Sequence, residues 1–171
     1  FFYAGPFKGA NVAARKQAAR AELASYSCLN EYLCMLLDLV KAFDRVPHWW
    51  LVHNAHLYDF PMLILRVSIA SYMLGRVICV DGIVSSVIFV TRGITAGSVL
   101  ATIEMRLLLI KCVDDAVYRF PEVVITLYVH DTSIEGVGPP RRSMSEVTEA
   151  TRFLVNAFLE MGLELSTNNN V

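Results

Sequence analysis

Two acidic segments far apart in the sequence carry side chains suited to metal-ion chemistry. The first is LDLVKAFDRVPH, residues 37–48, in which an apolar run ends at Asp38. The second is TLYVHDTS, residues 126–133, in which another apolar run ends at His130 and Asp131. Carboxylates delivered by the ends of two strands are what a magnesium site for phosphoryl transfer needs. Alternatively, Asp38 caps the next segment and Asp131 fills a hairpin turn.

A glycine-containing turn, TRGITAGSVL at residues 91–100, lies between the two acidic segments. Because glycine carries no side chain, Gly93 and Gly97 would allow the backbone to approach a nucleotide or a template closely. An ordinary loop between a strand and a helix is the alternative explanation. The glycine pair therefore indicates a nucleotide or template site only in combination with the acidic segments on either side of it.

In this order and at these spacings, the three segments resemble the palm motifs of reverse transcriptases, above all those of non-LTR retroelements and group II introns. Asp38 matches the first metal-binding aspartate of that family, and Asp131 matches the last aspartate of its tyrosine-x-aspartate-aspartate box. Residues 162–165 (GLEL) resemble the glycine-leucine segment that follows in the family. The resemblance runs from about residue 30 to the end. The other matching residues are Ala42, Phe43, Asp44, Arg92, Gly93, Gly97, Ser98, Leu100, Tyr128 and Val129.

The resemblance implies an RNA-directed DNA polymerase, a nucleotidyltransferase that adds deoxynucleotides to a primer 3′ end by a two-metal mechanism. Asp38 and Asp131 would be the ligands of Mg²⁺, with Mn²⁺ as the alternative ion. The implied partners are an RNA template with a DNA primer, deoxynucleoside triphosphates, and the fingers and thumb of a longer polyprotein. The residues that the resemblance places at the nucleotide or template are Phe43, Arg92, Gly93, Ala96 and Gly97.

Phe43 bears on the choice of sugar. In the family, a bulky aromatic residue at this position presses on the sugar and excludes a 2′-hydroxyl, so the resemblance favours deoxynucleotides. An RNA-templated RNA polymerase shares the palm, but those enzymes usually carry a small or polar residue there. A core phenylalanine that packs against the following helix is the alternative explanation from position alone.

Three departures from the family pattern predict a weakened enzyme. His130 stands where the family has the first aspartate of its acidic box, and imidazole is a poor ligand for magnesium. Ala96 replaces a glutamine of the glycine turn, and Asn168–Asn170 stand near the place of a lysine that could protonate pyrophosphate. We therefore expect a degenerate copy with little magnesium-dependent activity. The alternative is a non-catalytic palm-like binding or scaffolding module from a decayed retroelement.

Composition and charge limit the classes of protein. The 171 residues fit one domain, and 15 Lys and Arg against 16 Asp and Glu argue against strong autonomous nucleic-acid binding. A mean hydropathy of +0.47 is high, but charges interrupt every apolar run before the ~18 residues of a membrane span. We attribute the excess to surfaces that fingers and thumb would cover. Scattered cysteines and the lack of a signal-peptide pattern predict an intracellular protein, nuclear or cytoplasmic and not secreted.

The pattern of elements predicts an α+β palm, an antiparallel sheet with helices packed on one face in a ferredoxin-like or RRM-like core. Residues 1–30 would form a helical segment at the edge of the fingers, and residues 31–171 a palm domain without a thumb. Predicted helices are 8–25, 47–58, 61–74, 97–118 and 143–161. Predicted strands are 32–40, 77–80, 83–90, 123–128 and 132–135, with a hairpin turn at Asp81-Gly82, a tight turn at 129–131 and a loop at 136–140.

Two local patterns within these helices carry further expectations. Ser143, followed three residues later by Glu146, fits a capping box at the start of the last helix. His48, His53 and His56 on one helix raise the question of a zinc site, because residues three apart share a face. The sequence offers no evident fourth ligand, and neighbouring tryptophans fit an amphipathic helix, which is the reading we favour.

Overall fold

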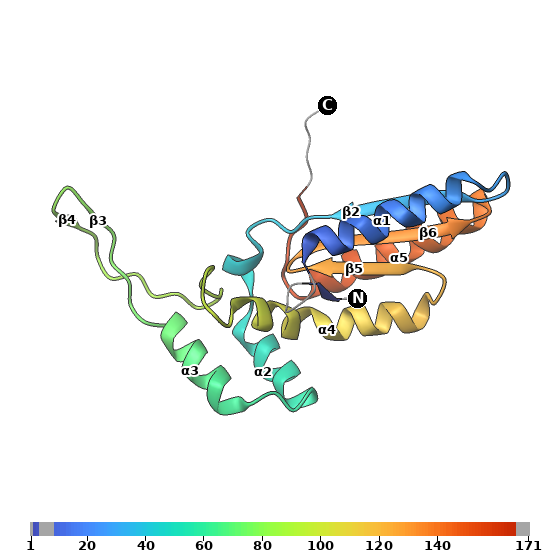
Figure 1. Ribbon diagram of the computed structural model, residues 1–171. Helices are drawn as coiled ribbons and strands as arrows, with labels where there is room; N and C mark the ends of the chain where they lie inside the picture. Colours follow the sequence, from blue (N-terminus) through green and yellow to red (C-terminus); the bar gives the residue numbers. More distant parts are fainter. Residues whose placement is uncertain (1, 4–8, 167–171) are drawn as a thin grey trace. The chain divides into compact units, whose positions relative to one another are not determined.

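The computed structural model describes residues 2–3 and 9–166 and is drawn in Figure 1. The chain divides into two compact units, one formed by Phe1–Val40 together with Leu109–Val171 and the other by Lys41–Leu108. A boundary at residue 30, between a fingers-edge segment and a palm, stays a prediction. Asp38, His130 and Asp131 all belong to the first unit, so its construction determines the geometry of the candidate site.

The first unit is built on a four-stranded sheet with the order β1-β5-β6-β2. The strands are β1 (Phe2–Tyr3), β2 (Glu31–Leu37), β5 (Val124–Tyr128) and β6 (Asp131–Gly138). β6 pairs antiparallel with both β5 and β2, whereas β1 pairs parallel with β5. The register sets Leu37 opposite Thr132 and Tyr128 opposite Asp131. The end of β2 and the β5–β6 turn therefore lie at the same edge of the sheet.

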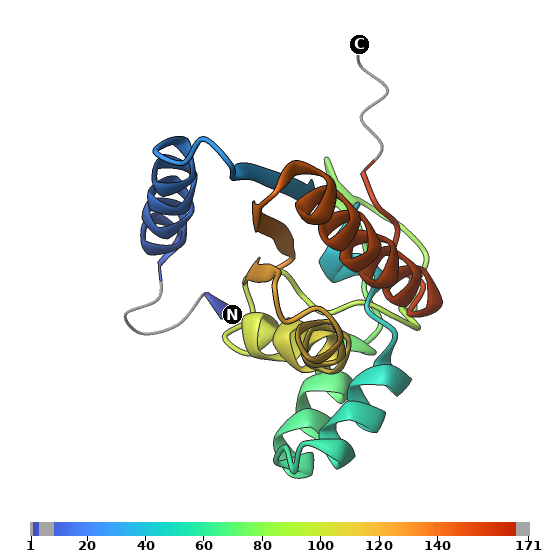
Figure 2. The ribbon, with the colours of Figure 1, turned by 90° about the vertical axis from the view of Figure 1, so that its right-hand side faces the viewer.

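Helices cover both faces of this sheet. Glu135 and Gly136 are neighbours on β6 and so point to opposite faces. On one face Glu135 pairs with Arg20 of α1 (Ala10–Ser25), and on the other Gly136 faces α5 (Pro140–Glu160). Figure 2 shows α1 and α5 on opposite sides of the strands. The α+β palm fold is confirmed, but the prediction that helices pack on one face only is wrong, because the buried Glu135 pairs with Arg20 and holds α1 on the second face.

The core of the first unit lies between the sheet and α5. Ile125, Leu127 and Ile134 alternate inward along β5 and β6, with at most 1% of each exposed. Leu154 and Phe158 of α5 are fully buried and lie four residues apart, the spacing of one helix face. Burying each such side chain stabilises the fold by about 1.5–3 kcal/mol, so this contact fixes the strands that end at the candidate site.

The second unit is mainly helical. Its elements are η1 (Ala42–Arg45), α2 (His48–Leu57), α3 (Met62–Tyr72), the hairpin β3 (Cys79–Val80) and β4 (Ile83–Val84), and the first part of α4 (Ala101–Arg119). Asn54 donates hydrogen bonds of 2.9 and 3.0 Å to the carbonyls of Leu107 and Leu108, which ties α2 to α4. The predicted hairpin at Asp81-Gly82 is confirmed, with φ of +50° and +81°, but its strands are shorter than predicted.

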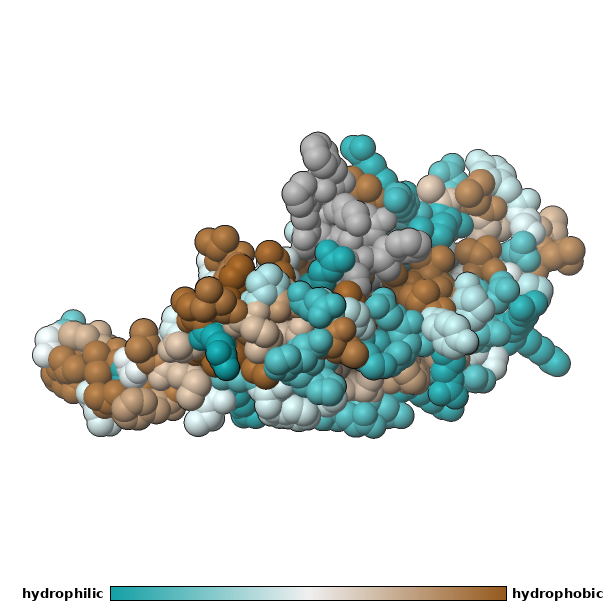
Figure 3. Space-filling view, turned by 90° about the horizontal axis from the view of Figure 1, so that it is seen from below, coloured by the Kyte–Doolittle hydropathy of each residue, from teal (hydrophilic) through white to brown (hydrophobic). Residues whose placement is uncertain are grey.

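Apolar side chains are exposed over the β3–β4 hairpin, as Figure 3 shows. Ile83 is 77% exposed and Phe89 is 74% exposed. These apolar residues contribute to the high mean hydropathy of the chain. Their exposure is unusual, because soluble monomers seldom expose large apolar patches. Within residues 2–3 and 9–166, no helix combines the length and hydropathy that crossing a membrane would require.

Two predictions about the start of the last helix are wrong. Residues 136–140 were expected to form a loop, but β6 continues to Gly138 and α5 begins at Pro140. A Cβ on Gly136 would lie 2.7 Å from the Val147 side chain, so this glycine serves close packing and not a turn. Ser143 is buried within α5 and does not cap it. The helix begins earlier, at Pro140, because proline suits the first helical position.

Candidate metal centre

Asp38 is held in place by backbone pairing on its carboxyl-terminal side. The amide of Ser166 donates to the carbonyl of Asp38 at 2.8 Å, and the amide of Val40 donates to the carbonyl of Glu164 at the same distance. A positive φ of +76° at Gly162 allows the chain to turn after α5 and return beside Asp38. The segment that resembles the family's glycine-leucine motif, residues 162–165, and the following Ser166 therefore fix the backbone around Asp38.

His130 and Asp131 are presented by the tight turn between β5 and β6. Val129 has a φ of +59°, a left-handed conformation that a β-branched residue adopts at a cost. Asp131 pairs with Tyr128 across the hairpin, which confirms the predicted tight turn, although Asp131 already belongs to β6. The hairpin thereby delivers both side chains to the sheet edge at which β2 ends.

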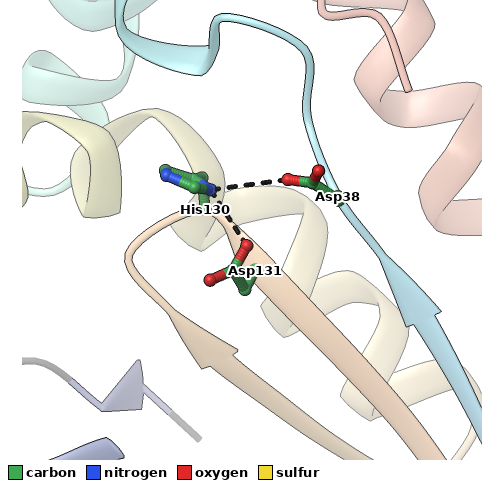
Figure 4. Close-up of side chains that lie close together, drawn as sticks. All are labelled: Asp38, His130 and Asp131. Carbon is green, nitrogen blue, oxygen red and sulfur yellow. Dashed lines mark ion pairs between the residues drawn. The ribbon is translucent and has the colours of Figure 1, made fainter. Parts of the chain in front are cut away.

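The three side chains meet at this edge, as Figure 4 shows. Nδ1 of His130 lies 3.1 Å from Oδ1 of Asp131 and 3.9 Å from Oδ1 of Asp38. One donor atom from each residue lies within 4.8 Å of the other two, and no other such group occurs among the described residues. The side chains of Asp38 and Asp131 are 62% and 61% exposed, so an ion or a substrate can reach them.

The chemistry of these donors fits one divalent ion. Metal–ligand bonds of about 2.0–2.2 Å place neighbouring donors roughly 3.0–3.4 Å apart, close to the shorter of the two observed distances. The two carboxylates suit magnesium or manganese, while the imidazole suits transition ions better. A second ion would depend on further oxygens, such as those of a nucleotide.

The glycine turn lies in the second unit and is packed against η1 and the start of α2. The amide of Gly93 donates to the Val46 carbonyl at 2.7 Å, and the ring of His48 donates from Nε2 to the Gly93 carbonyl at 2.7 Å. Gly93 has a φ of +96°, and a Cβ there would lie 2.8 Å from the backbone oxygen of Asp44. Gly97 also has a positive φ, +89°, but has no atom within 4 Å of such a Cβ.

The other predicted site residues are also in the second unit. Phe43 is half-buried in η1, and its backbone carbonyl accepts a 2.8 Å hydrogen bond from the amide of Ile94. Arg92 and Ala96 are exposed. Contacts with a nucleotide or template stay predictions for these residues. His53 and His56 are exposed, and the described residues include no metal-binding group that contains them. Asn168–Asn170 lie outside the described residues.

Comparisons with known proteins bear on the fold. No family model matches the chain, and no curated protein matches its sequence. Among solved structures, the protein is similar to apo telomerase from Candida tropicalis truncated from its C-terminal domain, with a TM-score of 0.64 and 12% sequence identity. The chain has a reverse-transcriptase-like fold. The similarity covers 95% of this chain and 36% of the telomerase chain, and at this identity it concerns the fold alone.

A polar cluster on the α1 side of the palm sheet was not predicted from the sequence. Glu135 is 1% exposed and accepts two hydrogen bonds of 2.8 Å from Arg20, one of 3.0 Å from Tyr32 and one of 3.2 Å from Ser133. Burial, with Glu135 nearby, raises the pKa of the Tyr32 hydroxyl above its ordinary range. The cluster joins α1, β2 and β6. It therefore stabilises β2, which ends just before Asp38, and β6, which begins at Asp131.

Proposed function

We propose that this chain is the palm-containing part of an RNA-directed DNA polymerase of the non-LTR retroelement or group II intron type. It would add deoxynucleotides to the 3′ end of a DNA primer on an RNA template. The observation that carries the proposal is the meeting of Asp38 and Asp131, from two segments, with donor atoms within 4.8 Å. Divalent ions bound there would activate the primer hydroxyl and stabilise the leaving pyrophosphate.

The chain's own residues would supply position and charge. Asp38 and Asp131 would provide negatively charged oxygens at an open edge of the sheet, where a primer end and a triphosphate can approach. The Ser166–Asp38 hydrogen bond and the β5–β6 pairing hold the two aspartates on a rigid frame. Such fixed geometry lowers the entropic barrier to an in-line displacement at phosphorus.

The second unit would contribute to nucleotide and template recognition. Phe43 would select deoxyribose by leaving no room for a 2′-hydroxyl. Gly97 is exposed and has open space around it, which supports close approach of a template strand to the backbone. Gly93, by contrast, is needed for packing against Asp44, so its contribution to the site would be indirect.

His130 would limit the reaction. An imidazole in place of a carboxylate removes one negative charge from the site and offers a nitrogen to an ion that prefers oxygen. A loss of several kcal/mol of transition-state stabilisation slows a reaction by thousands-fold or more, at a factor of ten for each ~1.4 kcal/mol. We therefore expect very weak extension with Mg²⁺ and partial recovery with Mn²⁺, which accepts nitrogen ligands more readily.

Primer extension tests the proposal, with an RNA template, a labelled DNA primer and deoxynucleoside triphosphates. The variant His130→Asp, placed in a full-length protein that includes a thumb, should extend the primer at least ~100-fold faster in Mg²⁺ than the unaltered sequence. Asp38→Asn should abolish extension, whereas Asp115→Asn, an exposed carboxylate on α4, serves as the matched control. Efficient magnesium-dependent extension by the unaltered chain would contradict the proposed role of His130.

A non-catalytic palm-like module is the second candidate, and one observation favours it. His130 lies within ion-pairing distance of both aspartates, so a protonated imidazole could neutralise them without any metal. A binding or scaffolding module needs neither carboxylate for its interactions. Asp38→Asn discriminates between the two, because a module would keep its partner while a polymerase would lose turnover.

A further inference from the structure

We infer that His130 makes this centre a single-ion site that binds zinc through Asp38, His130 and Asp131 in preference to magnesium. His130 is then a third metal ligand and not merely a missing carboxylate. Zinc bound to these donors would exclude magnesium from the same oxygens and so block the polymerase reaction. The blocking step rests on the proposed function, whereas zinc binding by itself does not.

The geometry points to coordination by the imidazole. Nδ1 of His130 is the ring atom that faces the carboxylates, at 3.1 Å from Asp131 and 3.9 Å from Asp38 (Figure 4). Zinc takes nitrogen at about 2.0–2.1 Å and carboxylate oxygen at about 2.0–2.2 Å, which places tetrahedral donors roughly 3.3–3.5 Å apart. The two His130 distances lie on either side of this spacing, and the donor atoms of Asp38 and Asp131 lie within 4.8 Å of each other, so rotation of the side chains would bring all three donors to one ion.

The donor set also favours zinc on chemical grounds. Imidazole is a common zinc ligand, and a site with nitrogen and oxygen donors binds zinc more tightly than the earlier divalent ions of the first transition row. Magnesium demands octahedral oxygen coordination and loses its waters reluctantly. Two carboxylates balance the charge of one dication, and three protein ligands leave a fourth position open. The exposure of Asp38 and Asp131 allows an ion to enter without local unfolding.

An internal ion pair is the rival arrangement for the same atoms. If the imidazole is protonated, its positive charge lies between the two carboxylates and takes the place of a metal ion. Zinc would then have to displace a proton and would bind weakly or not at all. The two arrangements differ in a direct measurement of metal binding, which does not depend on polymerase activity.

Isothermal titration calorimetry of the 171-residue chain at pH 7.5 with zinc chloride, and separately with magnesium chloride, provides that measurement. His53→Ala/His56→Ala is the background for every titration, because these two exposed histidines on α2 could bind zinc adventitiously. We expect one zinc ion per chain, bound at least ~100-fold more tightly than magnesium. His130→Ala and His130→Gln should each weaken zinc binding at least ~10-fold, and His130→Asp should shift the preference towards magnesium.

Cobalt(II) gives a second readout. Bound to a histidine and two carboxylates in low coordination, it should show visible absorption bands that zinc removes and that His130→Gln lacks. Zinc binding that is absent in the His53→Ala/His56→Ala background, or unchanged by both His130 variants, overturns the inference. If zinc does not bind but His130→Asp extends primers, the inference fails and the polymerase proposal stands. If zinc binds but no variant extends a primer, the zinc site stands and the polymerase proposal fails.

Discussion

Arg20 and Glu135, which are 115 residues apart in the sequence, form a two-pronged ion pair with both nitrogen–oxygen distances at 2.8 Å. Glu135 is almost fully buried, and the side chain of Arg20 is 25% exposed. Ala24 is the one buried residue of α1, so apolar contacts alone hold this helix weakly. The ion pair therefore makes an important contribution to holding α1 on the palm sheet, beside the 3.1 Å hydrogen bond from Gln17 to the sulfur of Cys34.

Arg20→Ala should lower the free energy of unfolding by about 3 kcal/mol, because it leaves the Glu135 carboxylate buried without its cation. Urea denaturation followed by circular dichroism measures the change. Arg15→Ala, at an exposed position on the same helix, is the control and should change stability by less than ~0.5 kcal/mol. Equal effects of the two substitutions would show that the ion pair does not hold α1.

Glu104 presents the opposite situation, a buried carboxylate with too few partners. It is fully buried on α4; Oε2 accepts a 2.8 Å hydrogen bond from Tyr72, while Oε1 has no hydrogen-bond partner among the described residues. Glu104→Leu should raise the free energy of unfolding by about 1–2 kcal/mol, because an apolar side chain avoids that cost and Tyr72 keeps its hydrogen bond to Ser98.

A double-mutant cycle checks this explanation. Tyr72→Phe removes the hydrogen bond to Glu104 and should destabilise the unaltered chain clearly, by about 1–3 kcal/mol. In the Glu104→Leu background the same substitution should cost much less, and the difference measures the coupling of the two side chains. Thermal unfolding of the four proteins gives the result, and a coupling near zero would contradict the observed contact.

The stability of the fold should decrease in alkali through Cys112. Burial raises the pKa of this thiol from its ordinary value of 9.0 to about 12. Between these values the folded chain keeps a proton that the unfolded chain releases, so the free energy of unfolding falls as pH rises, by about 1.4 kcal/mol per pH unit for one group. Below pH 9 this contribution is fully present.

Urea titrations at several pH values between 8.5 and 10.5 measure this slope. Burial also raises the pKa of Tyr32 and of Tyr72, and both tyrosines contribute in the same direction above pH 10. Cys112→Ala isolates the thiol, because it should flatten the slope between pH 9 and 10 while leaving the tyrosine contributions unchanged. An identical slope in the variant would mean that the thiol is accessible in the folded chain.

The two glycines of the turn should respond differently to the same substitution. Gly97→Ala should cost about 1–2 kcal/mol, the penalty of a left-handed conformation in open space. Gly93→Ala adds a clash with the Asp44 backbone and should cost about 3 kcal/mol or more. Differential scanning calorimetry compares the variants. If Gly97→Ala folds normally but loses template binding, the role proposed for that position gains support; equal stability costs would argue against close packing at Gly93.

Local features of the sequence predicted most of the elements. An alanine-rich segment and prolines at helix starts predicted helices, and β5 and β6 follow from apolar runs on either side of residues 129–131, because these signals depend on neighbours in the chain. The prediction of a loop at residues 136–140 was wrong because the sequence signal of Gly136 is also only local. A glycine in a loop and a glycine beneath a packed helix look alike in sequence, and only Val147, which is eleven positions away, distinguishes them.

By itself, the sequence determined which donors were available, Asp38, His130 and Asp131, and that each followed an apolar strand. Tertiary structure decided that they meet, because the pairing of β2 with β6 sets the edge and the return of Ser166 fixes the backbone of Asp38. It also decided that Nδ1 of His130 faces both carboxylates, a matter of side-chain orientation. Such long-range relationships arise from burial and pairing over the whole sheet, and residue types along the chain do not encode them locally.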